Sequence, residues 1–274
     1  MSRDLPARPL RIDFGYFVTL KEAAKIYGAS FFRLLAWSVV SAVSAGVICA
    51  LPILLGAANF REWGGETWQG LLAGVIAVVG MVVFHVLNSF LLTPAGCVII
   101  CDQAIREERA TFTESLGRAV AGVAVHAGSL SALFLVYTFL LILFLLPGLL
   151  LAFWLFEASP AAAILALLGF VLLGSVFLLV TSMLALPALL LEEEGASNAL
   201  LRSWQLSTQG LSALVGIALT FLLVQSTITI PFVALGLAGL GGLVHGALGL
   251  FLPAIMVAAY HGLAAEDARI VGRS

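Results

Sequence analysis

Long apolar runs without a charged side chain dominate the chain, and short charged segments separate them. Five such runs cover residues 34–60, 67–101, 119–156, 158–191 and 203–265. Each run is longer than the ~20 residues that an α-helix needs to cross a bilayer core of ~30 Å. The pattern therefore predicts an all-α integral membrane protein.

Two runs are too long for a single crossing, and their helix breakers predict where they turn. The last run would extend ~95 Å if it were one helix, so we expect it to fold back at the glycine cluster 235–242. In the third run, Pro147-Gly148 is expected to end the span and leave 148–156 as an outer turn or short helix. Six spans result, at about 34–58, 69–94, 119–147, 160–191, 210–234 and 242–264. They form a single membrane domain, 14–274, after a flexible basic N-terminal segment, 1–13.

Polar-faced segments precede the odd-numbered spans. Residues 14–33 have an amphipathic pattern that predicts a helix in the cytoplasmic interface, or alternatively an extension of the first span. Residues 112–118 and 196–208 are also predicted helices, and Thr111 with Glu114 has the pattern of a capping box. The even-numbered spans each contain a Pro-Ala pair, at Pro94, Pro187 and Pro253. We interpret this as three parallel hairpin repeats, each preceded by a cytoplasmic interfacial helix; the alternative is coincidence, because proline is common in membrane helices.

The distribution of basic residues predicts the orientation. Twelve Lys and Arg residues flank the spans on one side and only Arg61 lies on the other, which places the basic side and both termini in the cytoplasm. The 274 residues are 62% apolar and 10% charged, with a mean hydropathy of +1.13. A net charge of −2 argues against a nucleic-acid partner. Cys97 and Cys101 are expected to share a helix face and to pack there.

The segment 194–210 joins an acidic helix end to a short polar-faced helix. Its characteristic residues are Glu194, Gly195, Ala199, Leu200, Arg202, Ser203, Trp204, Leu206, Ser207 and Gly210. This segment resembles the loop signature of a bacterial membrane-domain family. That domain is fused to some glycerophosphodiester phosphodiesterases and also occurs alone as an uncharacterised six-helix protein. The resemblance implies the six-helix fold but no established activity. Family members carry further basic residues around this helix, whereas this chain has Gln205, Gln209 and Ser212.

The candidate functional residues within the predicted spans are polar side chains rather than Asp, Glu, Lys or Arg. His85, Asn88, His126 and Gln225 are the candidates for an intramembrane cluster that binds a headgroup or a cation. The alternative is hydrogen bonding between helices, which contributes about 0.6 kcal/mol per contact. No ionisable Asp, Glu, Lys or Arg lies deep in a predicted span, and no metal or cofactor site is expected.

These features favour a non-enzymatic protein of the bacterial inner membrane. We expect a scaffold or accessory subunit whose cytoplasmic-face amphipathic helices engage membrane lipids or a protein partner. The alternative is a transporter or channel for a small apolar or lipid-like substrate. Cleavage of a phosphodiester would need a soluble catalytic domain with acidic metal ligands, and no part of this sequence is left to form one.

Overall fold

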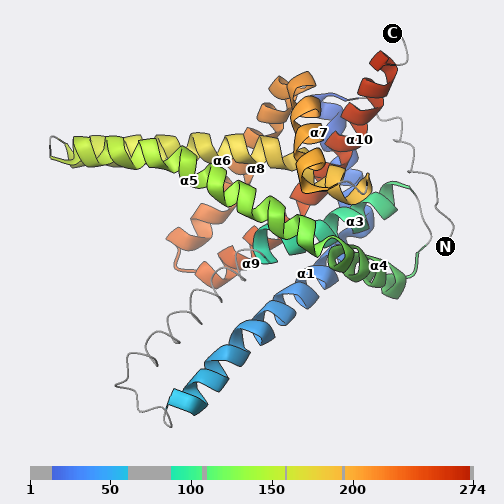
Figure 1. Cartoon of the computed structure of the whole chain (residues 1–274), viewed down its shortest axis with the longest axis horizontal. Coiled ribbons are helices and arrows are strands. Elements are labelled where there is room, and N and C mark those ends of the chain that lie inside the picture. Colours follow the sequence, from blue (N-terminus) through green and yellow to red (C-terminus); the bar gives the residue numbers. More distant parts are fainter. Residues whose placement is uncertain (1–13, 61–87, 107–109, 158, 193–194, 272–274) are drawn as a thin grey trace.

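The computed structural model describes residues 14–60, 88–106, 110–157, 159–192 and 195–271, and all regular elements within these ranges are helices (Figure 1). In chain order they are α1 (Tyr16–Phe60), the π-helix η1 (Asn88–Leu92), α3 (Thr93–Ile105), α4 (Phe112–Val125), α5 (Ala127–Phe156), α6 (Pro160–Leu191), α7 (Ala196–Gln209), α8 (Leu211–Ala234), α9 (Ala238–Gly249) and α10 (Phe251–Val271). The predicted all-α class is confirmed. Within these ranges, four segments are long and apolar enough to cross a membrane: Tyr16–Val47, Ala127–Phe156, Leu211–Phe232 and Leu240–Ile270.

Helix α1 is continuous across the boundary that the sequence predicted near Arg33. No proline or glycine interrupts the chain there, so nothing forces the backbone to leave the helix. The Arg33 side chain reaches the segment just before α4, where Nη2 donates to the Ala110 carbonyl at 3.2 Å. A separate interfacial helix over 14–33 is therefore wrong, and the alternative, an extension of the first span, describes the structure.

The third span differs from the predicted range 119–147. The first of these residues belong to α4, and α5 continues through Pro147 as one helix. A proline inside a membrane helix removes only a local hydrogen bond, and α5 lies against α6 at this point, where a side chain on Gly148 would overlap Phe170. The predicted helix end and the outer turn after it are wrong, because packing on α6 keeps this segment helical.

The later spans follow the prediction more closely. Helix α6 has the predicted bounds 160–191, and α8 ends one residue before the predicted glycine break. Gly236 adopts a φ of 73° in that break, a conformation that favours glycine. The last predicted span, 242–264, is divided between α9 and α10 at Leu250. Pro253 explains this division, because a proline has no N–H for the preceding turn and its ring crowds the carbonyl four residues earlier. The second span, predicted over 69–94, lies largely outside the described residues.

The buried core lies where the Pro-Ala segments meet. Helices α3, α6 and α10 contact one another in pairs, and the residues that follow Pro94, Pro187 and Pro253 are mostly buried. From this core, α1 and the α5–α6 pair extend in different directions (Figure 1). Along α5, the buried residues are Leu130, Leu133 and Gly148, so most of its apolar side chains are exposed and suited to contact with lipid.

The predicted capping box at the start of α4 is present. The Glu114 N–H donates to Thr111 Oγ1 at 3.3 Å, and the Thr111 N–H donates to Glu114 Oε2 at 2.8 Å. The Thr111 N–H and the Thr111 hydroxyl both donate to Glu114 Oε2, and they hold the pKa of the Glu114 carboxyl below its ordinary value. Each partner satisfies one backbone donor that the helix itself leaves unpaired.

Replacing Thr111 with alanine is expected to loosen the first turn of α4. Amide hydrogen exchange over 112–116 should become about fivefold faster, because loss of an N-cap frees backbone donors in that turn. Thr113→Ala is the control, since Thr113 is an exposed threonine in the same turn that does not cap the backbone. Equal exchange in the two variants would contradict the prediction. The comparison is made by hydrogen–deuterium exchange in detergent micelles.

Candidate functional site

A buried charge network links α3 to α10. Asp102 Oδ1 lies 2.7 Å from His261 Nε2, and Arg106 Nε donates to Asp102 Oδ2 at 2.7 Å. His261 is 2% exposed, and its Nδ1 has no hydrogen-bond partner within the described residues. Burial alone would raise the pKa of the Asp102 carboxyl, but hydrogen bonds to His261 and Arg106 outweigh burial and hold the pKa below 3.8. Asp102 is therefore a charged anchor between the two core helices.

The cysteines beside this network are packed as predicted. Cys97 and Cys101 are fully buried in α3. Burial raises the pKa of the Cys101 thiol to about 12, against the opposing effect of a hydrogen bond to Ser30. Because only a thiolate is an effective nucleophile or metal ligand, burial disfavours the reactive form of Cys101.

A second network fixes the polar-faced helix α7 to α10. Arg202 Nη1 donates to Asp267 Oδ2 at 2.7 Å, and Arg202 Nε lies 3.7 Å from Glu192 Oε1. Gln209 Nε2 donates to Asp267 Oδ1 at 2.8 Å, and the Tyr260 hydroxyl donates to Glu192. Burial lowers the pKa of the Arg202 guanidinium, but Asp267 and Glu192 outweigh it and raise the pKa above its ordinary value. The guanidinium group of Arg202 is therefore bound to carboxylates within the protein.

The remaining residues of the family-like segment shape the same helix. Gly195 is the N-cap of α7, and Leu200 is partly buried. The residues on the packing face are Ala199, Ser203, Leu206, Ser207 and Gly210. A side chain on Gly210 would overlap Phe14 and Leu263, so this position needs glycine. Glu194 lies outside the described residues.

The exposed surface of α7 has an apolar side and a polar side. Leu201 and Trp204 are 59% and 53% exposed and share one face, because they are three residues apart. Gln205 and Gln209 are four residues apart and occupy the adjoining exposed arc, in which Gln205 borders Leu201 and points away from Trp204. A helix with this division fits the boundary between hydrocarbon and water.

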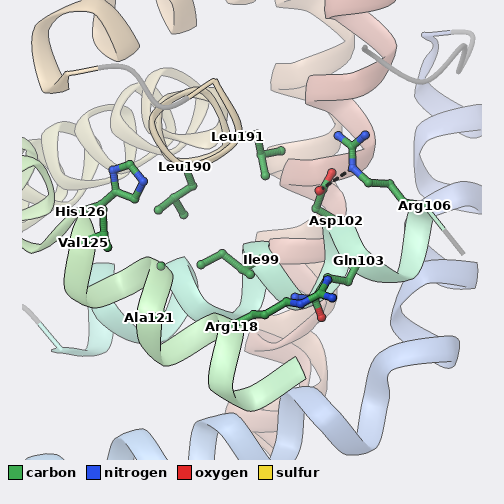
Figure 2. A pocket seen from close by; sticks show the side chains of 11 residues that line it. Ile99, Asp102, Gln103, Arg106, Arg118, Ala121, Val125, His126, Leu190 and Leu191 are labelled. Carbon is green, nitrogen blue, oxygen red and sulfur yellow. Dashed lines mark hydrogen bonds and ion pairs between the residues drawn. The ribbon is translucent and has the colours of Figure 1, made fainter. Parts of the chain in front are cut away.

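An open cleft of about 400 Å³ lies between α3, α4 and α6 (Figure 2). One part of its lining is apolar and includes Ile99, Val125, Leu190 and Leu191. The other part carries Asp102, Gln103, Arg106, Arg118 and His126. Figure 2 shows Arg118 beside Gln103 at one side of the cleft and His126 at the other, with Ile99 and Leu190 between them. The cleft combines cationic groups with an apolar wall.

The structure distributes the predicted intramembrane polar residues over several helix pairs. Ser41 Oγ on α1 donates to Asn88 Oδ1 at 2.9 Å. Gln225 Nε2 on α8 lies 3.2 Å from His245 Nε2 on α9. His126 lines the cleft, and His85 lies outside the described residues. The hydrogen bonds of Asn88 and Gln225 are of the interhelical kind, and a shared ligand cluster stays a prediction.

The sequence reading missed the pairing of Asp102 with His261. Nothing in the local sequence around Asp102 indicates its partner, and His261 is one of four histidines in the chain. A signal was available, because each residue lies eight positions after the proline of its Pro-Ala pair, Pro94 or Pro253. Aligning the two segments on these prolines would have placed the two side chains at the same level of the core.

Comparisons with protein-family models, with curated proteins and with solved structures gave no significant match. The relation to the membrane domain of glycerophosphodiester phosphodiesterases therefore stays a prediction that depends on the segment 194–210 alone.

Proposed function

We propose that this chain is a non-enzymatic, six-span protein of the bacterial cytoplasmic membrane, a scaffold or accessory subunit that engages lipid through its inner-face helices α4 and α7. Both termini lie in the cytoplasm in this proposal, on the side of the basic residues. The observation that carries it is the exposed surface of α7. Leu201 and Trp204 form an apolar side next to the polar side of Gln205 and Gln209.

The way α7 is held supports this role. Its packing face is buried in the core, and Arg202 ties it to Asp267 on α10. A helix that is fixed in this way presents the same face to its surroundings at all times. Exposed leucine and tryptophan beside exposed glutamines match the composition of the interfacial zone, where aromatic rings lie at the level of the headgroups.

The lining of the cleft favours lipid engagement over transport. A transporter would need a polar path through the spans, for which Asn88 and Gln225 were candidates. Asn88 is instead buried and hydrogen-bonded to Ser41, and neither Asn88 nor Gln225 lines the cleft between α3, α4 and α6.

Spin labels on the two exposed sides of α7 test the proposal. Trp204→Cys and Gln205→Cys, which point about 100° apart on the helix, are made in a background with Cys49, Cys97 and Cys101 replaced by alanine, labelled with a nitroxide, and reconstituted in phosphatidylglycerol–phosphatidylcholine vesicles. The label at 204 should collide more with oxygen, which concentrates in lipid. The label at 205, the matched control, should collide more with a water-soluble nickel chelate. If both labels are equally accessible to the chelate, α7 does not lie on the membrane and the proposal fails.

A further inference from the structure

We propose that the exposed face of α7 lies on zwitterionic lipid and gives no preference to anionic lipid. This inference rests on the proposed function, in which α7 lies on the membrane, and it names the class of headgroup that the helix meets there. The charges on and beside α7 carry the inference. The exposed face holds no charged side chain, and the arginine of this helix is bound within the protein.

The exposed residues of α7 are all uncharged. Leu201 and Trp204 form the apolar part of the face, and Gln205 places an amide at the border of Leu201. Amides and hydroxyls can donate to the phosphate and ester oxygens of any phospholipid, whether or not its headgroup carries a net charge. This face therefore binds a lipid surface without reading its charge. Its exposed polar residues are Ser197, Asn198, Gln205, Thr208 and Gln209.

Arg202, the only cation in the sequence of α7, is turned towards carboxylates of the protein. Its Nη1 donates to Asp267 Oδ2 at 2.7 Å, its Nε lies 3.7 Å from Glu192 Oε1, and its side chain is 24% exposed. Gln209 Nε2 donates to the other oxygen of Asp267 at 2.8 Å. The phosphate of an anionic lipid would have to displace a carboxylate that already holds the guanidinium in a charge-assisted hydrogen bond. Arg202 therefore gives such a lipid no advantage.

The charges around α7 leave an excess of negative charge. Among the described residues, Arg202, its two carboxylate partners and the charges within one turn of those partners comprise three carboxylates and two arginines: Glu192, Arg202, Glu266, Asp267 and Arg269. The N-terminus of α7, where a helix attracts anions, follows directly on the glutamates 192–194 in the chain. Exposed cations are what draw anionic lipid to a protein, and here the net charge has the opposite sign.

Quenching of a fluorophore on α7 by labelled lipids tests the proposal. Trp204→Cys is made in the same cysteine-free background, labelled with bimane, and reconstituted in mixed vesicles of phosphatidylcholine and phosphatidylglycerol. A nitroxide quencher is placed on the acyl chain of one lipid or of the other, and the two quenching curves give the relative association constant of phosphatidylglycerol at position 204. We expect a constant no greater than unity that does not depend on salt, because no exposed cation of α7 contributes to it.

Two variants of the exposed Gln205 in this labelled protein calibrate the measurement. Gln205→Lys adds one cation beside the label and should raise the constant about fivefold at low salt, the ratio that corresponds to ~1 kcal/mol. Gln205→Asn is the matched control, because it changes the side chain without adding charge, and it should leave the constant unchanged.

The outcomes separate this inference from the proposed function. If both quenchers reach the label but phosphatidylglycerol is favoured in the parent at low salt and not at high salt, the headgroup assignment is wrong while α7 still lies on lipid. Equal constants in Gln205→Lys and the parent would also overturn the assignment, because charge on this face would then not select the lipid. If neither quencher reaches the label, α7 does not lie in lipid and the proposed function fails with it.

Discussion

Replacing Gly96 with alanine is expected to lower the free energy of unfolding by about 3 kcal/mol. Gly96 lies in the first turns of α3, and an added methyl group would overlap the indole ring of Trp37. The ring cannot move aside freely, because Trp37 is 6% exposed and its Nε1 donates to the Thr93 carbonyl at 2.9 Å. Either the indole gives up this hydrogen bond or α1 separates from α3. The measurement is unfolding by sodium dodecyl sulfate in mixed micelles.

Two further variants separate a clash from a general effect of helix glycines. Gly117→Ala, on α4, meets no atom within 4 Å and should be neutral or slightly stabilising, because alanine favours the helix over glycine. Gly96→Ala combined with Trp37→Leu should be more stable than expected from the sum of the two single changes, because the smaller side chain makes room for the methyl group. Additive losses in the double variant would contradict the proposed overlap.

Replacing Asp102 with asparagine should cost about 3 kcal/mol, because it removes one partner of a buried charge network. Arg106 would lose its ion pair, and nearly buried His261 would lose its charged acceptor. The figure is at the lower end for buried pairs, since the Asp102 side chain is 13% exposed. The same detergent titration measures the loss.

Glu22→Gln is the control for Asp102→Asn. The ion pair between Glu22 and Lys25 is largely exposed on α1 and should contribute little. If Asp102→Asn costs no more than Glu22→Gln, the network does not anchor α3 to α10.

The dependence of stability on acid pH provides a second check on Asp102. Its pKa is lower in the fold than the ordinary 3.8, so its stabilisation is complete above that value and is lost as the pH falls through the folded pKa. The asparagine variant should lack this part of the acid dependence.

Some helix boundaries could be predicted from the local sequence, because one or two residues control them. The capping box at Thr111 depends on residues three apart, and the break after α8 depends on a conformation that glycine adopts easily. The fourth apolar run, with serine and proline at its start and acids at its end, likewise indicated the bounds of α6. In contrast, Pro147 did not end a helix, because contact with α6 compensated for its local cost.

The candidate site was less predictable, because its residues come from distant parts of the chain. The sequence analysis singled out His126 and Arg202 but did not pair them with the groups they meet. Asp102 and His261 are 159 positions apart, and their 2.7 Å contact depends on how α3 and α10 pack. Hydrophobic periodicity says which face of a helix is buried, not which other helix buries it.

The sequence by itself determined that this protein is helical and apolar enough for a membrane, because these properties follow from composition and from the spacing of charges. It also indicated the start of α4, both ends of α6 and the end of α8, through capping residues, proline and glycine. Only the tertiary structure decided that the three Pro-Ala segments meet in one core, that Asp102 is hydrogen-bonded to His261 on α10, and that two arginines line a cleft with an apolar wall. These features depend on contacts between segments far apart in the chain, which burial of apolar surface favours without specifying which segments pair.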